Sequence, residues 1–234
     1  MDFNLNAIPS QKGRIAIVTG ANVGIGYETV IGLAKKGAKV IMACRNLQKA
    51  ERAKSEIEKK IPGADLEIIL LDLLSLQSVR EFARVYASKY DRLDILIENA
   101  GIMIPPFSKT NDGFESQMGV NYFSHFLLTN LLFPILNKTN GARIITLSSK
   151  AAEGGKIDFE NLNAEKSYSR LGAYSQSKLA CLMFAYELDR RLKKSGSKVI
   201  SISAHPGVSN TDLARHVPKI LLMVTMPFFS FFYS

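Results

Sequence analysis

Residues 174–178 read Tyr-Ser-Gln-Ser-Lys and place a phenol four positions before an amine. Residues four apart share one face of a helix, so Tyr174 and Lys178 can point into the same cleft. A free tyrosine has a pKa of about 10 and is a poor acid–base catalyst at neutral pH. A nearby cation favours the phenolate and lowers that pKa. Of the eight tyrosines, only Tyr174 has lysine at this spacing, so the pair is our candidate for proton transfer.

A glycine-rich turn, Thr19-Gly-Ala-Asn-Val-Gly-Ile-Gly, follows the first apolar run. Gly20 would permit the sharp turn, Gly24 a close approach to pyrophosphate, and Gly26 tight helix packing. The free N–H groups and the helix dipole would then hold the anion, with Asn22 and Ile25 in the same turn as further binding candidates. A plain strand-to-helix turn is the alternative, but the position in a first strand–helix unit favours a dinucleotide.

The second apolar run ends in Ala-Cys-Arg-Asn, without the acidic residue that usually binds the ribose hydroxyls of NAD. Arg45 stands where a 2′-phosphate would lie, and guanidinium suits phosphate through forked hydrogen bonds. The sequence therefore favours NADP(H) over NAD(H). The alternative is that Arg45 is merely exposed or stacks on adenine.

Short β-branched runs alternate with amphipathic stretches along the chain. The runs are continuously apolar, which is typical of a parallel sheet covered by helices on both faces. Right-handed crossovers then give a doubly wound, Rossmann-type α/β fold, and we expect one domain over residues 1–234. The predicted strands are 14–19, 39–44, 66–71, 93–97, 143–147 and 198–203, and the predicted helices are 24–36, 46–60, 78–89, 113–136 and 171–194.

These motifs together resemble the classical short-chain dehydrogenase/reductase family. The glycine turn has its T-G-x-x-x-G-x-G spacing, and the tyrosine–lysine pair follows a serine at the end of the fifth strand. The resemblance implies that Ser149, rather than its neighbour Ser148, polarises the substrate oxygen and that Tyr174 exchanges the proton. It also implies that Lys178 binds the nicotinamide ribose, and that Asn121 holds a water linking the lysine to solvent.

Three further segments match the cofactor contacts of that family. Their alternative interpretations are a helix N-cap, a loop turn and a helix start. Glu98 replaces the asparagine that usually precedes the second segment. The implied cofactor residues are Asp72 near adenine, then Asn99, Ala100 and Gly101, then Pro206, Gly207, Val208 and Thr211 near the nicotinamide.

The 25 residues from Ser149 to Tyr174 make a long gap for the family, and it includes Ile157–Leu162. This gap resembles the branch of retinol dehydrogenases and WW-domain oxidoreductases. The resemblance implies NADP(H) and an apolar retinoid-, steroid- or lipid-like aldehyde or ketone. Two alternatives remain open: a catalytically weak NADP(H)-binding or regulatory protein, and a carbon–carbon double-bond reductase of the protochlorophyllide type.

The C-terminal segment Leu213–Ser234 is rich in apolar residues but contains Lys219 and Pro227. A bilayer span needs about 20 apolar residues, so we expect a substrate lid or tail with at most weak contact to a membrane surface. Family members continue with another helix and a final strand. The resemblance thus predicts a shortened C-terminus that lacks these elements, and it leaves the oligomeric state open.

The net charge is +9, but acids interrupt the Lys and Arg residues, as in 49–60. This pattern indicates solvated helix surfaces rather than nucleic-acid binding. Cys44 and Cys181 cannot form a disulfide framework, and the polar N-terminus lacks the order of a secretory signal, so we expect a cytoplasmic protein. His125, His205 and His216 show no ligand spacing, so we expect no metal site.

Overall fold

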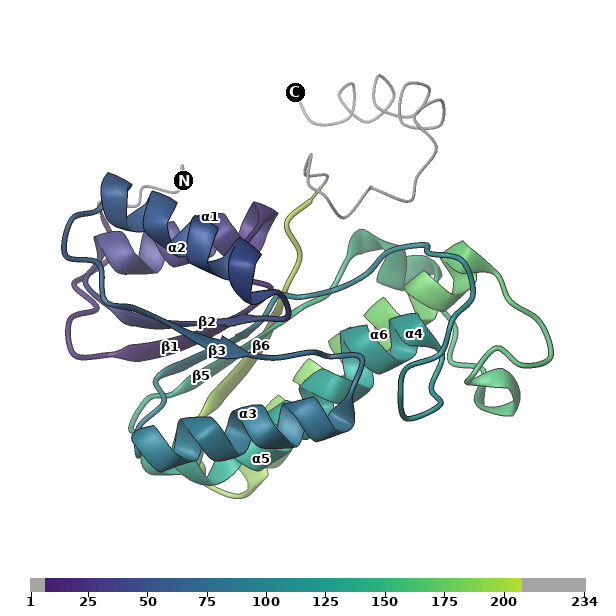
Figure 1. Cartoon of the computed structure of the whole chain (residues 1–234). Helices are drawn as coiled ribbons and strands as arrows, with labels where there is room; N and C mark the ends of the chain where they lie inside the picture. The colour runs from purple at the N-terminus through teal and green to yellow at the C-terminus, as the bar shows by residue number, and fades with distance from the viewer. Residues whose placement is uncertain (1–6, 208–234) are drawn as a thin grey trace, which may run out of the picture.

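Six short apolar strands form one parallel sheet in the computed structural model, which describes residues 7–207 (Figure 1). The strand order is β3-β2-β1-β4-β5-β6, with the chain reversing direction across the sheet between β3 and β4. This order confirms the doubly wound, Rossmann-type fold expected from the sequence. The strands are β1 Ile15–Thr19, β2 Lys39–Cys44, β3 Leu66–Leu70, β4 Ile95–Glu98, β5 Arg143–Leu147 and β6 Ile200–Ala204.

Helices cover the two faces of the sheet (Figure 1). One face carries α1 and α2, and the other carries α3, α5 and α6. Polar side chains fix several helix starts: Asn46 accepts from the Lys49 N–H at the start of α2, and Ser75 and Ser169 do the same for α3 and α6. The helices are α1 Gly24–Lys35, α2 Leu47–Lys60, α3 Leu76–Lys89, α4 Ser116–Met118, α5 Ser124–Lys138 and α6 Arg170–Lys194.

The expectation of one continuous helix over residues 113–136 is wrong. Gly113 has a φ of +86° and closes a turn back to Thr110, so the helix cannot begin there. The Glu115 carboxylate instead accepts from the N–H groups of Gln117 and Met118, which starts α4. A π-helical turn, Gly119–Phe123, then separates α4 from α5. Such turns disturb the regular hydrogen-bond ladder and are frequent at functional sites. Other element boundaries differ from expectation by no more than about two residues.

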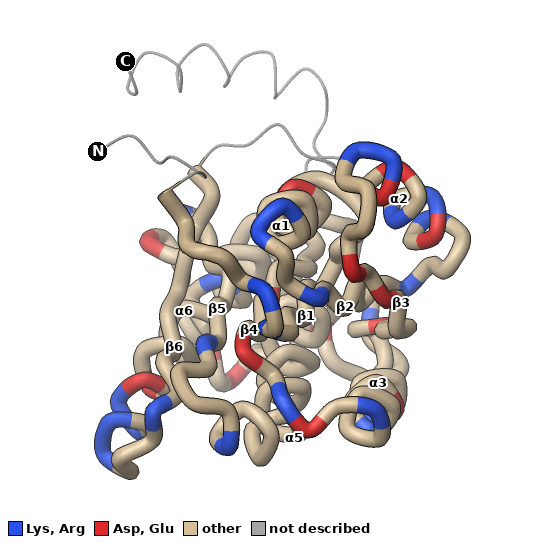
Figure 2. Tube along the Cα trace, turned by 90° about the vertical axis from the view of Figure 1, so that its left-hand side faces the viewer, with Lys and Arg blue, Asp and Glu red and all other residues tan. Residues whose placement is uncertain are grey.

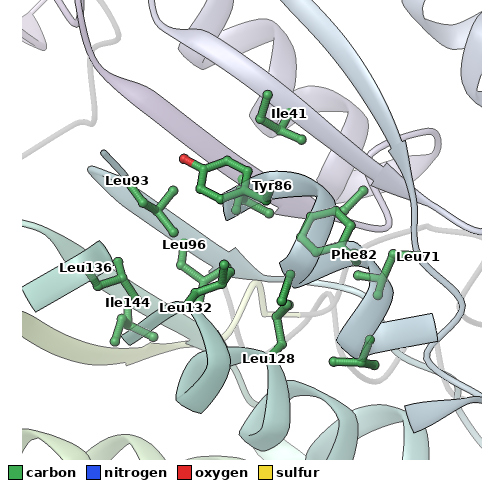
Figure 3. Packing of buried hydrophobic residues seen from close by; sticks show 14 of the residues in the cluster. Ile41, Leu71, Phe82, Tyr86, Leu93, Leu96, Leu128, Leu132, Leu136 and Ile144 are labelled. Carbon is green, nitrogen blue, oxygen red and sulfur yellow. The ribbon is translucent and has the colours of Figure 1, made fainter. Parts of the chain in front are cut away.

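Two apolar cores hold these layers together. The larger one lies between the sheet and α3 and α5, and Figure 3 shows its side chains interlocking from strands and helices. It includes Leu96 of β4, Leu132 of α5 and Phe82 and Tyr86 of α3, all buried. The second core joins α1 and α2 to the opposite face. Burial of this apolar surface is the main favourable contribution to folding.

Coverage of the sheet is incomplete at β6, contrary to the expectation that every strand is buried on both faces. Ile200 and Ile202 point to one face and are 42% and 45% exposed, whereas Ser201 on the other face is buried against α6. Within residues 7–207 this part of the sheet therefore has one uncovered apolar face.

Charged residues of both signs alternate over the helix surfaces (Figure 2). Several form ion pairs one helical turn apart, as in Arg191 with Glu187 and Lys193 with Asp189. In the part of the chain that the structure describes, no helix has the length and apolar character needed to cross a bilayer.

Truncation of Leu132 tests the larger core. Leu132→Ala should lower the free energy of unfolding by about 2–5 kcal/mol, because it removes buried contacts and leaves a cavity. Leu47→Ala on the exposed start of α2 is the matched control and should change it by less than about 1 kcal/mol. Urea unfolding measures both. Equal destabilisation by the two variants would contradict this assignment of the core.

Candidate active site

The carboxyl ends of the strands bring the candidate residues to one edge of the sheet. In the parallel registers, Thr19 lies beside Ala43, and Leu147 lies beside Ala204. In such a sheet, ligands bind outside these strand ends, at the point where the strand order reverses. The candidates Gly20, Arg45 and Asn99 directly follow β1, β2 and β4, and Ser149 lies two residues after the end of β5.

The glycine turn after β1 has the backbone geometry of an anion-binding loop. Gly20 and Gly24 have φ values of +65° and +56°, which side chains disfavour. A Cβ on Gly26 would lie 2.3 Å from the carbonyl oxygen of Gly20, so only glycine fits there. Among the described residues no side chain caps α1 at Val23, and its first turn holds no acid. The first N–H groups of α1, near Asn22 and Ile25, therefore suit a pyrophosphate.

Thr19 ties the glycine turn to the segment after β4. Its hydroxyl oxygen accepts from the N–H groups of Asn99 and Ala100, both at 2.9 Å. The Asn99 amide donates to the Thr19 carbonyl at 2.8 Å. These hydrogen bonds hold the glycine turn against Asn99 and Ala100, and the cofactor contacts of these two residues stay a prediction.

Arg45 and Asp72 follow β2 and β3 at this edge of the sheet. Arg45 is exposed immediately after β2, and the backbone of Ala21 and Asn22 hydrogen-bonds to the neighbouring Cys44 thiol. The backbone of Arg45 therefore lies close to the glycine turn. Asp72 follows β3, and its carboxylate accepts from the Leu74 N–H at 3.0 Å.

Ser149 and Tyr174 lie side by side at the end of β5. The Ser149 hydroxyl accepts from the Ala151 N–H and also hydrogen-bonds with the Tyr174 phenol. Ser148 points elsewhere, since its hydroxyl donates to the Lys178 carbonyl at 2.7 Å. Tyr174 is 4% exposed. The Tyr174 pKa is raised, because burial disfavours the phenolate more strongly than the Ser149 hydrogen bond favours it.

Lys178 is also 4% exposed, and its ammonium donates to the Leu147 carbonyl at 2.9 Å. Burial lowers the Lys178 pKa. The sequence led us to expect that this ammonium would lower the Tyr174 pKa. In the structure burial outweighs any such effect, and the pKa moves upward instead. A Cβ on Gly101 would lie 3.5 Å from the Lys178 Nζ, so the segment after β4 closes over the lysine.

Asn121 lies in the π-helical turn and anchors that same segment. Its side-chain oxygen accepts from the Ile102 N–H at 2.8 Å, and its amide donates to the Ile102 carbonyl and the Ser177 hydroxyl. Its backbone carbonyl accepts from Cys181 and His125. These protein groups occupy the polar atoms of Asn121, so the water-binding role implied by the resemblance stays a prediction.

His125 was not singled out as a functional residue from the sequence. It is buried, and burial lowers its pKa to about 4, so the ring is neutral. Its Nδ1 lies 3.0 Å from the Asn121 carbonyl, which can only accept, and its Nε2 lies 3.0 Å from the Thr19 hydroxyl. The ring therefore donates to Asn121, accepts from Thr19 and links the cofactor loop to the π-helical turn. The i,i+4 spacing of Asn121 and His125 was the available signal.

Glu98 ends β4 beneath this site and is completely buried. Its two carboxylate oxygens accept from the Thr129 and Thr146 hydroxyls at 2.6 and 2.7 Å. Burial raises its pKa to about 7, while these hydrogen bonds lower it. A carboxyl stands here where the family pattern has an amide, and it titrates near neutral pH.

The remaining candidates lie at or beyond the limit of the described chain. Pro206 and Gly207 are exposed after β6 at the same sheet edge. Val208, Thr211, His216 and Leu213–Ser234 lie outside the described residues. Within residues 7–207, no group of three or more potential ligands could hold a metal ion.

Comparison with protein families and curated proteins identifies close relatives. Residues 14–220 match the family described as short chain dehydrogenase. The chain is 49% identical over 214 residues to mouse retinol dehydrogenase 13, covering 90% of this chain and 64% of that protein. It is 44% identical over 211 residues to human retinol dehydrogenase 12, covering 90% of this chain and 66% of that protein. The chain therefore spans less than two thirds of the length of these relatives.

Solved structures show the same fold. A protein from Mycobacterium paratuberculosis superposes with a TM-score of 0.80 at 44% identity, covering 92% of this chain and 76% of the other. A short chain dehydrogenase from Shigella flexneri complexed with NADP has a TM-score of 0.71 and 27% sequence identity, covering 88% of this chain and 82% of the other. The Pseudomonas aeruginosa RhlG/NADP complex has a TM-score of 0.73 and 27% sequence identity, covering 93% of this chain and 82% of the other.

The buried Glu98 makes stability depend on pH. Its folded pKa of about 7 lies above the ordinary glutamate value of 4.5, so the folded state retains the proton to a higher pH than the unfolded state does. The contribution is fully present below the unfolded pKa and is lost as pH rises through 7. Between pH 5 and pH 8 the loss should be about 2.5 kcal/mol. Glu98→Gln should remove this dependence, measured by urea unfolding at both pH values.

The exposed Glu51 provides the control for this prediction. Glu51→Gln should leave the difference in unfolding free energy between pH 5 and pH 8 as in the parent chain. If Glu98→Gln shifts stability by the same amount at both pH values, the raised pKa of Glu98 is wrong.

Proposed function

Because the chain belongs to the short chain dehydrogenase family, we propose that it is an NADP(H)-dependent oxidoreductase acting on the carbonyl or alcohol of an apolar substrate. One observation carries the proposal: Ser149, Tyr174 and Lys178 meet at the end of β5, on the sheet edge that also bears the glycine turn. This placement sets a proton donor and a hydroxyl beside a dinucleotide loop.

The protein groups divide the proton chemistry among them. The Ser149 hydroxyl orients the substrate oxygen, and the Tyr174 phenol donates a proton to that oxygen during reduction or removes it during oxidation. Burial keeps the phenol protonated, which is the form required for donation. Lys178 holds the start of α6 against β5 through the Leu147 carbonyl and presents a positive charge at the site. When bound, the nicotinamide supplies or accepts the hydride.

Two features support NADP(H) over NAD(H). The end of β2 carries Arg45 and no acid, and a guanidinium suits a 2′-phosphate. Two structures similar to this chain are described as NADP complexes. The uncapped start of α1 fits the pyrophosphate of either dinucleotide, and the tight packing at Gly26 holds that helix start close to Gly20.

The substrate class follows from the relatives and from the segment after β4. The similar curated proteins are named retinol dehydrogenases, which points to retinoid-like aldehydes, ketones or alcohols. Ile102, Ile104 and Phe107 give this segment an apolar character, and the Ile102 backbone is bonded to the Asn121 side chain. The single-domain organisation, the cytoplasmic location and weak membrane contact of Leu213–Ser234 stay predictions.

Removal of the Tyr174 hydroxyl tests the reaction. Tyr174→Phe should lower kcat for reduction of an apolar aldehyde by NADPH by at least about 100-fold, because the proton donor is lost. NADPH affinity should change by less than about threefold. Loss of absorbance at the NADPH wavelength measures turnover, and a panel of aldehydes and ketones supplies the substrate.

Tyr186→Phe is the matched control, since this tyrosine is 67% exposed on the same helix, α6. It should retain the parent activity. Comparable turnover by Tyr174→Phe and the parent chain would exclude the proposed mechanism. NADPH binding without turnover in the parent chain would favour the regulatory alternative.

The cofactor preference is tested at Arg45. Arg45→Asp should weaken NADPH binding by about 10- to 100-fold through loss of charge-assisted hydrogen bonds, and NADH binding by much less. Fluorescence titration gives both dissociation constants. Arg52→Asp on the exposed face of α2 makes the same charge change and should have little effect on either. Equal losses for the two cofactors at Arg45 would refute the preference.

A further inference from the structure

We propose that Gln117 and Tyr168 are positioning residues that join two distant segments, residues 102–107 and 163–170, into one wall of the substrate site. The wall determines how well long apolar substrates bind. The inference rests on the proposed function for its substrate, and on the contacts of these two side chains for its mechanics.

Each of the two segments is joined directly to an element that carries candidate site residues. The first begins at Ile102, which both accepts from and donates to the Asn121 side chain. The second ends at Arg170, the first residue of α6 and one helical turn before Tyr174. The second segment is the last part of the long stretch between Ser149 and Tyr174 that the sequence analysis noted. The proposed chemistry gives this stretch no role.

Gln117 connects the two segments through a buried amide. Its side-chain oxygen accepts from the Ile104 N–H at 2.9 Å. Its amide nitrogen donates to the Tyr168 hydroxyl at 3.1 Å and to the Arg170 carbonyl at 3.0 Å. Gln117 itself is 0% exposed, so its amide loses free energy if one of these partners is removed and no other takes its place.

Tyr168 completes the connection. Its hydroxyl accepts from Gln117 and donates to the Pro105 carbonyl at 2.9 Å. Its ring packs edge-on against Phe107, with the ring centroids 5.2 Å apart. One phenol therefore fixes both the backbone and an apolar side chain of the segment after β4.

Backbone strain marks the same two segments. Among residues 7–207, the non-glycine residues with positive φ are Ile104 at +46° and Ala164 at +54°. A β-branched residue in this region is a conformational outlier, and such strain concentrates at functional sites and ligand clamps. One strained residue lies in each segment, and the Gln117 oxygen directly holds the N–H of Ile104.

We call Gln117, Tyr168 and their hydrogen bonds the clamp, and further contacts also hold the two segments together. The Glu115 N–H donates to the Asn163 side chain, and Lys109 pairs with Glu165 at 2.6 Å. These contacts should keep the segments folded when one hydrogen bond is removed. The apolar surface that the clamp orients is Ile102, Ile104 and Phe107, which suits an extended hydrocarbon rather than a short polar chain.

Tyr168→Phe is the primary variant, because it deletes the shared hydroxyl and keeps the ring. Hydrogen exchange should become about fivefold faster in both segments, 102–107 and 163–170, as expected for loss of about one net hydrogen bond to each. With NADPH, the KM for decanal should rise about fivefold while its kcat stays within about twofold. Reduction of butanal should be unchanged.

Gln117→Met is the second variant, since it preserves length and removes all three amide hydrogen bonds. It should accelerate exchange in the same two segments by more than Tyr168→Phe does. Tyr186→Phe, which removes an exposed hydroxyl from α6, is the control and should change neither exchange nor KM.

The outcomes separate this proposal from the proposed function. Faster exchange in only one segment, or in neither, would overturn the clamp whatever the activity. Faster exchange in both with an unchanged KM for decanal would overturn the role in substrate binding. Absence of turnover in the parent chain would instead refute the proposed function, and the exchange data alone would then decide whether the clamp exists.

Discussion

Burial of the Lys178 ammonium at the end of β5 constrains the rest of the site. A buried cation is costly unless it is hydrogen-bonded, and the Leu147 carbonyl supplies that partner. The bond holds α6 against β5, and this places Tyr174 beside Ser149 one turn earlier. Burial lowers the pKa of the lysine and raises that of the tyrosine, so it favours the neutral form of both groups. The protonated phenol is the form that the proposed reduction requires.

The surrounding polar groups extend this constraint in two directions. On one side, Thr19 and His125 connect the cofactor loop to the π-helical turn of Asn121. On the other, the Gln117 amide connects the segment after β4 to the start of α6. Each buried polar group in these networks has a partner within the described chain, as low-dielectric surroundings require. The glycine turn, the π-helical turn, the segment after β4 and the start of α6 are thus joined by side-chain hydrogen bonds.

Local sequence signals were sufficient to predict the fold and to predict that most candidate residues lie at the carboxyl ends of the strands. Continuous apolar runs predicted the parallel strands, and the predicted helices 24–36 and 46–60 agree with α1 and α2 within one residue at each end. The π-helical turn could not be predicted, because apolar periodicity does not register one extra residue per turn. The Tyr174 pKa direction was also missed, since four-residue spacing reports a neighbouring charge but not the depth of burial. Roles for His125 and Gln117 depend on partners far along the chain, which spacing alone does not reveal.

The most direct measurement of the central claim is a crystal structure of the protein with NADP⁺ and an apolar alcohol bound together. The account predicts that the alcohol oxygen lies within about 3.2 Å of both the Tyr174 and Ser149 hydroxyls. It also predicts that Lys178 remains buried beside the Leu147 carbonyl. An alcohol oxygen that contacts neither hydroxyl, with dinucleotide bound at the glycine turn, would contradict the account.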